Sequence, residues 1–195
     1  EIKLKEFHLS IMKDPEFENL ERIFWQEIPR MEIGSLFKEV KPVGGEAKKE
    51  AVQDIIKQNN FEPQNLIYIG DSITDAEPLR FARENHGLAV SFNGNKYALK
   101  ESSIAIISDN TLITSIITDL FNQYDSEVVL EFASLFGENP QDTLAKFDVK
   151  QELAMELDKT NTRIELITSE NLEELINDSS LFRKQIRGES IGGLG

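Results

Sequence analysis

The sequence predicts an α/β protein in which a parallel sheet is flanked by helices. Two observations point to this class: short apolar runs recur within residues 37–124, and segments with helical spacing of apolar residues separate them. The apolar runs are continuous, which is typical of strands that are buried on both faces. Beyond this region we expect helices alone. The predicted parts are therefore an N-terminal segment (1–36), an α/β core (37–124) and a helical appendage (125–195).

The core is expected to contain three strands and three helices. The strands cover 66–69, 88–92 and 104–107. The helices cover 46–59, 75–85 and 111–122. Each helix places its apolar residues on one face, as an amphipathic helix does when it packs on a sheet. In the second helix Pro78 falls in the first turn and Gly87 lies just past the end, which is the usual distribution of these residues at helix termini.

The flanking parts are read from the same kinds of pattern. Helical patterns after the core cover 126–136, 142–157 and 170–186. Residues 2–9 alternate apolar and polar side chains like a half-exposed strand, and 14–28 has helical spacing. The glycine-rich stretch 187–195 is expected to be mobile. It is not read as a dinucleotide-binding loop, because no strand precedes it and no helix follows.

Composition excludes several classes of function. The formal net charge of -14 argues against a nucleic-acid partner, because binding phosphate backbones requires a basic face. No apolar run is long enough to cross a membrane, and no signal segment opens the chain. The chain has no cysteine and two histidines, His8 and His86, which excludes disulfides and disfavours a zinc site. We therefore expect a cytoplasmic protein that binds neither nucleic acid nor membrane.

The residues with the clearest chemistry follow the first core strand. Asp71 and Asp75 come directly after strand 66–69, at the kind of position where open α/β sheets bind ligands. Two carboxylates four residues apart can converge on a hard cation such as Mg²⁺. The alternative is structural: Asp71 would end the strand and Asp75 would cap the following helix. Taken alone, the pair leaves both interpretations open.

A lysine one β-α unit upstream bears on this choice. Lys48 lies in the first turn of the helix that begins after Gly44-Gly45. Glycines let the backbone approach an anion closely, and a helix N-terminus favours negative charge. The ammonium group could then hold a phosphoryl oxygen and neutralise charge during its transfer. The alternative is a solvated lysine in a charged helix, like its neighbour Lys49.

Taken together, these motifs resemble a known family. Gly-Gly-x-x-Lys at 44–48, followed by a helix, a strand and Gly-Asp-Ser-x-x-Asp at 70–75, resembles the third and fourth motifs of the haloacid dehalogenase superfamily. The phosphoserine-phosphatase-like group, with its uncharacterised archaeal members, is the most similar, and the strand and loop at 89–95 add to the likeness. The resemblance covers roughly residues 40–107. It implies a Rossmann-like core with the site at its strand ends.

The resemblance also implies roles for individual residues. The expected activity is that of a Mg²⁺-dependent phosphatase acting on a small phosphorylated substrate. Lys48 would be the catalytic residue that orients the nucleophile and the phosphoryl group. Asp71 would bind Mg²⁺ directly, and Asp75 would act in or near its second coordination sphere. The residues implied to bind the substrate or its phosphate are Gly45, Ser72, Thr74 and Asn93.

One part of the family pattern is absent from these residues. The first motif, Asp-x-Asp, supplies the nucleophile and the general acid, and no Asp-x-Asp occurs before Lys48. Ser10 is a candidate for the second motif. We therefore expect the C-terminal part of a phosphatase, inactive alone, with 1–36 as a remnant of the cap or the return from it. The missing N-terminal segment, or a second copy of the chain, would then be a protein partner.

Other functions remain open. The helical tail and the missing nucleophile also fit a non-catalytic binding or regulatory subunit with the same fold. A receiver-like phosphoacceptor domain combines acidic residues with a lysine on a parallel sheet, but there the lysine follows the acids, whereas Lys48 precedes Asp71. Dehalogenation of haloalkanoates is possible on the same fold, although the metal-type pair favours phosphate chemistry.

Overall fold

The computed structural model describes residues 15–32, 34 and 43–188. The chain divides into two compact units, Glu1–Pro42 and Val43–Gly195. The strand expected at 2–9, Ser10, and residues 189–195 of the expected mobile end lie outside the described residues.

The described part of the first unit is helical. It consists of α2 (Pro15–Arg22), a π-helical turn η1 (Ile23–Glu27) and a 3₁₀ turn η2 (Ile28–Arg30). The helical pattern expected over 14–28 is confirmed for these residues. Trp25 is 74% exposed, so the indole contributes little to the packing of this unit by itself.

The second unit contains a four-stranded sheet and most of the helices. Its strands are β1 (Ile67–Gly70), β2 (Leu88–Phe92), β3 (Ile104–Ser108) and β4 (Thr162–Leu166). Its helices are α4 (Gly45–Asn59), α5 (Ala76–Glu84), α6 (Lys96–Glu101), α7 (Leu112–Gln123), α8 (Ser126–Glu138), α9 (Pro140–Lys146), α10 (Gln151–Leu157) and α11 (Leu172–Arg187). Two single 3₁₀ turns, η3 (Pro63–Asn65) and η4 (Ile73–Asp75), stand before and after β1.

The sheet is mixed, with the order β1-β2-β3-β4. The first three strands are parallel, and β4 pairs antiparallel with β3, placing Ile164 opposite Ile106. The two inner parallel strands are almost completely buried, as their continuous apolar runs predict. Within the described residues, β1 forms one edge of the sheet. The protein is therefore an α/β protein with a mixed sheet flanked by helices.

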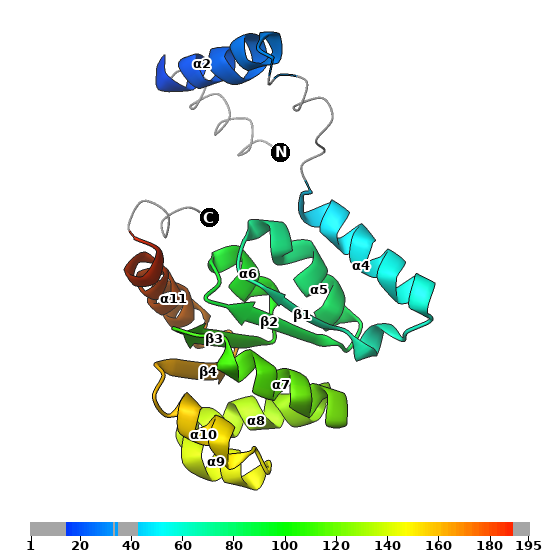
Figure 1. The fold of residues 1–195 in the computed structure, drawn as a ribbon, viewed down its shortest axis with the longest axis vertical. Helices are drawn as coiled ribbons and strands as arrows, with labels where there is room; N and C mark the ends of the chain where they lie inside the picture. Colours follow the sequence, from blue (N-terminus) through cyan, green and yellow to red (C-terminus); the bar gives the residue numbers. More distant parts are fainter. Residues whose placement is uncertain (1–14, 33, 35–42, 189–195) are drawn as a thin grey trace. The chain divides into compact units, whose positions relative to one another are not determined.

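Helices cover both faces of this sheet (Figure 1). One face packs against α7, α8, α9 and α10, and the other against α5, α6 and α11. On the face covered by α7–α10, the largest fully buried side chains include Phe132 of α8. Its ring packs edge-on against Phe147, with 5.3 Å between the ring centroids. Aromatic packing of this kind contributes beyond the area it buries.

Helix α4 confirms the helix expected over 46–59 but does not bury its apolar stripe. None of its residues is buried in the structure, and Ile55 is 56% exposed. An amphipathic helix normally gains its stability by covering that stripe. In the described part of the chain, the outer side of α4 therefore remains uncovered.

Two expectations for the tail are wrong. Strands do not stop after residue 124, because β4 joins the sheet and Ile164 is fully buried in the main core. The sequence signal was weak because a single buried residue is flanked by charged Arg163 and Glu165. The helix expected over 142–157 is also interrupted: Asp148 takes a left-handed conformation (φ 51°), and this turn separates α9 from α10.

Among the described residues, no helix is both long and apolar enough to span a membrane.

Candidate functional site

The candidate site lies at the carboxyl ends of β1 and β2, where open α/β sheets bind ligands. An open cavity of about 440 Å³ is found there. The residues that line it are Lys48, Ile69, Gly70, Asp71, Ser72, Asp75, Phe92, Thr111, Thr114 and Arg187. The structure thus brings four of the predicted site residues to one cavity, namely Lys48, Asp71, Ser72 and Asp75.

The turn after β1 is built around the carboxylate of Asp75. Its Oδ2 atom accepts hydrogen bonds from Ser72 Oγ at 2.8 Å and from the backbone N–H groups of Asp71 and Ser72 at 3.2 and 3.1 Å. Gly70 makes this fold possible, since a Cβ there would lie 2.5 Å from the Cβ of Asp75. The capping role considered from the sequence is not the one observed: Asp75 stands at the N-cap of α5 without a side-chain capping hydrogen bond, and instead forms a capping box with Ser72 around the 3₁₀ turn η4.

Lys48 reaches this turn from the preceding helix. Its Nζ atom donates to Asp75 Oδ1 at 2.8 Å and to Thr74 Oγ1 at 2.9 Å, and Tyr68 donates its hydroxyl to the same Oδ1 at 3.1 Å. The two contacts of Lys48 join residues that are 26 and 27 positions apart in the sequence. The side chain of Lys48 is 32% exposed and lines the cavity. A solvated lysine, the alternative drawn from sequence, does not describe this arrangement.

The surroundings of Asp75 favour its ionised form. Burial alone would raise the pKa of Asp75. Hydrogen bonds from Lys48, Ser72 and the backbone N–H of Asp71, together with the positive charge of Lys48, outweigh burial and hold that pKa below its ordinary value. Burial raises the pKa of Tyr68, and the negative charge of Asp75 raises it further. Tyr68 is therefore a neutral hydrogen-bond donor to a fixed carboxylate.

Asp71 is held by two arginines of α11 that the sequence interpretation did not include. Arg183 Nη1 contacts Asp71 Oδ2 at 3.2 Å, the carbonyl oxygen of Asp71 at 2.9 Å and that of Asn93 at 2.7 Å. Arg187 Nη2 contacts the same Oδ2 at 3.0 Å. The available signal was the four-residue spacing of Ser179, Arg183 and Arg187, which places them on one face of a helix.

The polar groups of Ser72 and Thr74 bond mainly within the turn. Ser72 Oγ donates to Asp75, and Thr74 Oγ1 accepts from Lys48 and lies 3.1 Å from Ser72 Oγ. The resemblance implied phosphate contacts for both. The structure shows them positioning Lys48 and Asp75, and Ser72 additionally lines the cavity.

The side chain of Asn93 joins two strand ends. Its amide nitrogen donates to the carbonyl of Ser108 at 2.7 Å, and its amide oxygen accepts from the backbone N–H of Ser108 at 2.9 Å. Asn93 is only 2% exposed and adopts a positive φ of 46°. Its side chain thus fixes the end of β2 to the end of β3. Its backbone carbonyl oxygen accepts a hydrogen bond from Arg183 of α11.

Gly45 lies beside a carboxylate of the protein itself. A Cβ at Gly45 would lie 1.9 Å from Oε2 of Glu77, so this glycine permits a close approach of the Glu77 side chain. A helix N-terminus does favour an anion. In this structure the carboxylate of Glu77 occupies the space beside that glycine.

The carboxylates at this cavity meet the needs of Mg²⁺ in part. Both oxygens of Asp75 already accept hydrogen bonds, whereas the side chain of Asp71 is 36% exposed at the cavity and is paired through Oδ2 with Arg183 and Arg187. Mg²⁺ is commonly bound by one or two carboxylates, with waters and substrate phosphate completing its coordination. Asp71 is the carboxylate whose exposure suits this role, in competition with its two arginines, and Asp75 shapes the turn. No group of three or more His, Cys, Asp or Glu suited to a metal occurs among the described residues.

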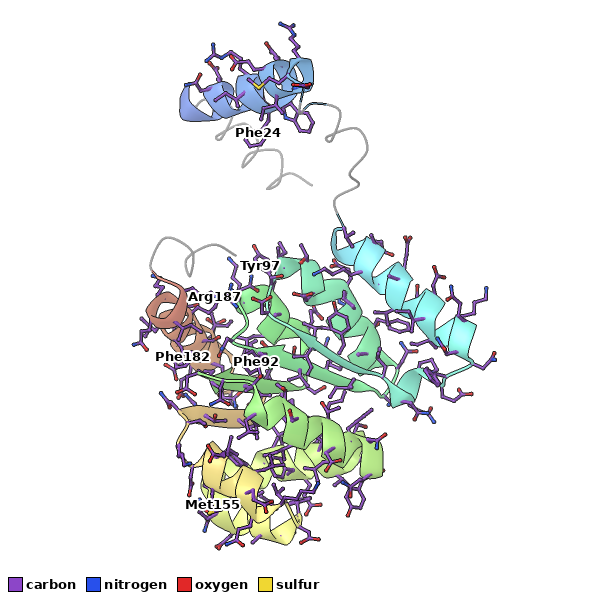
Figure 2. All side chains as sticks on the ribbon, in the orientation of Figure 1. Phe24, Phe92, Tyr97, Met155, Phe182 and Arg187 are labelled. Atoms are coloured by element: carbon purple, nitrogen blue, oxygen red, sulfur yellow. The ribbon has the colours of Figure 1, made fainter. Side chains whose placement is uncertain are left out.

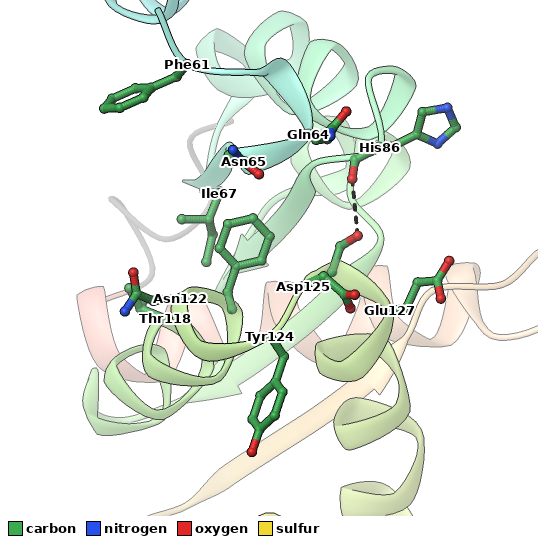
Figure 3. Close-up of a pocket in the computed structure, with 12 residues that line it drawn as sticks. Phe61, Gln64, Asn65, Ile67, His86, Thr118, Asn122, Tyr124, Asp125 and Glu127 are labelled. Atoms are coloured by element: carbon green, nitrogen blue, oxygen red, sulfur yellow. Dashed lines mark hydrogen bonds between the residues drawn. The ribbon is translucent and has the colours of Figure 1, made fainter. Parts of the chain in front are cut away.

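A larger cavity, of about 800 Å³, lies near the amino end of β1. It is lined by Phe61 and Ile67 on one side and by residues of α7 and the following turn, including Thr118 and Asn122, on the other (Figure 3). His86 borders it through its carbonyl, which accepts from Ser126, while its imidazole points away in Figure 3. This cavity is at the wrong end of the strands for an α/β active site.

Comparison with known proteins bears on the fold. No model of a known protein family matches this sequence, and neither does any protein of curated function. The structure is similar to that of gene product AF1437 from Archaeoglobus fulgidus, with a TM-score of 0.61 and 24% sequence identity. The match covers 99% of this chain and 55% of AF1437, so the chain spans about half the length of that protein. At this identity the likeness concerns the fold.

Proposed function

We propose that this chain is the C-terminal part of a Mg²⁺-dependent phosphohydrolase of the haloacid dehalogenase type. The observation that carries the proposal is the contact of Lys48 with Asp75 and Thr74, which unites two separate sequence motifs at one cavity beyond the strand ends. Phosphoryl transfer is catalysed mainly by positioning the reacting groups and by stabilising the charge that develops on them. Ordered cationic and anionic side chains beyond the strand ends can supply both effects.

Each residue would have a defined task. The Lys48 ammonium has three N–H donors, of which two bond to Asp75 and Thr74, so it can present a donor to a phosphoryl oxygen in the cavity. Asp75 holds the ammonium and the turn in place. Asp71 offers a carboxylate for Mg²⁺. When bound, the metal would supply Lewis-acid polarisation of the phosphoryl oxygens.

The nucleophile would come from a segment outside this chain. An aspartate oxygen would form a bond to phosphorus as the bond from phosphorus to the ester oxygen breaks, and the leaving oxygen would take a proton from the second aspartate of the Asp-x-Asp motif. Water would then attack the aspartyl-phosphate, releasing phosphate and regenerating the carboxylate. Three features of the described residues support a segment on the outer side of β1. Ile69 of this edge strand is 40% exposed, and the two cavities flank its two ends. The uncovered stripe of α4 supports the same segment.

A non-catalytic regulatory subunit is the second candidate, and the pairing of Asp71 favours it. Two guanidinium groups already neutralise the carboxylate that would bind the metal. If this pairing is permanent, the fold would be retained without chemistry. The same experiment separates the two candidates.

The test is Mg²⁺-dependent hydrolysis of p-nitrophenyl phosphate by the product of the complete gene and by the 195-residue chain. We expect turnover from the former, none from the latter, and a loss of about 100-fold or more with Asp71→Asn. Asp119→Asn, which removes an exposed carboxylate of α7, is the matched control and should leave turnover unchanged. Equal turnover with and without Asp71, or a complete gene that encodes no Asp-x-Asp, would leave the regulatory subunit as the better account.

A further inference from the structure

Helix α11 presents one face to the strand ends. Leu175, Ser179, Arg183 and Arg187 are spaced four apart and therefore lie on one side of the helix. The first two are fully buried, and Ser179 Oγ donates to the carbonyl of Gly94 at 2.7 Å. The helix is thus fixed at its apolar end, and its last turn ends at the cavity.

Arg183 acts as the fixed member of the arginine pair. It is 3% exposed and bonds to the backbone carbonyls of Asp71 and Asn93, which belong to the ends of two neighbouring strands. A buried guanidinium with these partners cannot leave without stranding two carbonyl groups. We regard Arg183 as a positioning residue that sets the spacing of the strand ends.

Arg187 is more exposed than Arg183 and has fewer of the contacts described above. Its side chain is 36% exposed, and its ion pair with Asp71 is made through one nitrogen, Nη2, at 3.0 Å. It lines the same cavity as Lys48, and Figure 2 shows it at the end of α11 where that helix approaches α6. An ion pair exposed to this extent stabilises a fold only weakly, so its partner can be exchanged.

The charge at this cavity favours an anion. Among the described residues that line it or contact its turn, Asp71 and Asp75 are the carboxylates, each with one close cation in Arg183 or Lys48. Arg187 adds a third cation to these two pairs. A planar guanidinium is also suited to bidentate binding of a phosphate group.

We propose that Arg187 is an anion-binding residue of the cavity, which exchanges Asp71 for the phosphate group of the ligand while Arg183 stays in place. The phosphate identity of the ligand rests on the function proposed above. The assignment makes the C-terminal helix part of the binding site. Lys48 and Arg187, from helices at opposite ends of the unit's sequence, would hold the same phosphate.

The test is titration of the metal-free 195-residue chain with inorganic phosphate, followed by backbone and Arg side-chain NMR shifts. Arg187→Gln should weaken phosphate binding about tenfold. Lys184→Gln removes the same charge from an exposed position on the same helix and should change affinity by less than twofold. Arg187→Lys keeps the charge without the planar fork and should fall between, which keeps the test decisive if the Gln variant folds poorly.

Two results would overturn the assignment. The first is that phosphate fails to shift the Arg187 and Gly70–Ser72 signals of the wild-type chain, and the second is that Arg187→Gln binds phosphate as tightly as Lys184→Gln. These outcomes are separable from failure of the phosphohydrolase proposal. If phosphate binding depends on Arg187 but the gene product shows no Mg²⁺-dependent turnover, the phosphohydrolase proposal is wrong and the Arg187 assignment stands. If turnover depends on Asp71 but phosphate binding is unaffected by Arg187→Gln, the Arg187 assignment is wrong and the phosphohydrolase proposal stands.

Discussion

At the scale of single residues, Asp75 organises the site. Its two oxygens accept hydrogen bonds from side chains of three segments and from two backbone N–H groups, and its side chain is 9% exposed. A buried carboxylate in such a network is costly to disturb, because every donor around it would lose its partner. Its role in holding Lys48 therefore appears as a stability effect that can be measured without any substrate.

We predict that Asp75→Asn lowers the free energy of unfolding by about 3 kcal/mol, since an amide supplies one acceptor oxygen and places an NH₂ group against existing donors. Urea denaturation of the 195-residue chain measures this change. Asp119→Asn, at an exposed position, should change stability by less than about 0.5 kcal/mol. Similar values for the two variants would mean that the Asp75 network contributes little.

The stabilising effect of the Asp75 carboxylate should also depend on pH. The pKa of Asp75 in the folded state lies below its ordinary value of 3.8, so its stabilising contribution is complete well above pH 3.8. It is lost as the pH falls through the lower folded-state pKa. The stability gap between wild type and Asp75→Asn should therefore narrow in acid, measured by urea denaturation from pH 7 to pH 3. A gap that is constant over this range would contradict the ion pair.

The sequence predicted part of this residue-level picture. Lys48, Asp71 and Asp75 lie in consecutive β-α units, and parallel strands bring such units to one edge. Arg183 was not foreseen, because it comes from 112 positions beyond Asp71, and no local pattern encodes so distant a contact. Asn93 was expected at the substrate; its short polar side chain instead satisfies two buried backbone groups of Ser108.

At the scale of elements, β4 connects the tail to the core. Ile164 packs with β3 and α8 on one face, while Arg163 on the other face pairs with Glu165, and with Glu174 and Asp178 of α11. The helices of the core were predictable from their spacing of apolar residues. Strand β4 was not, because its alternation spans five residues and its neighbours are charged on the α11 side.

We predict that Ile164→Ala lowers the free energy of unfolding by about 2–4 kcal/mol, as removal of a fully buried side chain usually does. Ile186→Ala, which shortens the same type of residue at a position 47% exposed, should cost less than about 1 kcal/mol. Thermal or urea unfolding of both variants provides the comparison. If Ile164→Ala costs no more than its control, the segment after residue 124 is separate from the core.

At the scale of the whole second unit, the strands of the sheet are unevenly covered by neighbouring strands and helices. β2 and β3 are paired on both sides and covered on both faces, whereas β1 has one bonded neighbour among the described residues. Helix α4, which packs against α5, buries no residue. An edge strand with exposed apolar side chains is a natural site for strand addition. The unit is therefore firmest where β3 lies and least so at β1.

Hydrogen exchange should report this gradient. We expect amides of β2 and β3 to exchange slowest, and those of α4 and β1 faster, because opening is local at weakly covered edges. In the product of the complete gene, the β1 amides that do not bond to β2 should become protected, while β3 stays the same as an internal control. Unchanged β1 exchange in the longer protein would count against a segment covering that edge.

The contact of Arg183 with Asp71 has a consequence for biosynthesis. The two residues are separated by 112 positions, so a ribosome adds the aspartate well before the arginine that neutralises it. At typical elongation rates of about 5–20 residues per second, roughly 6–22 seconds pass between them. The ion pair between Arg183 and Asp71 can therefore form only after helix α11 has been synthesised, so the charge of Asp71 is neutralised late.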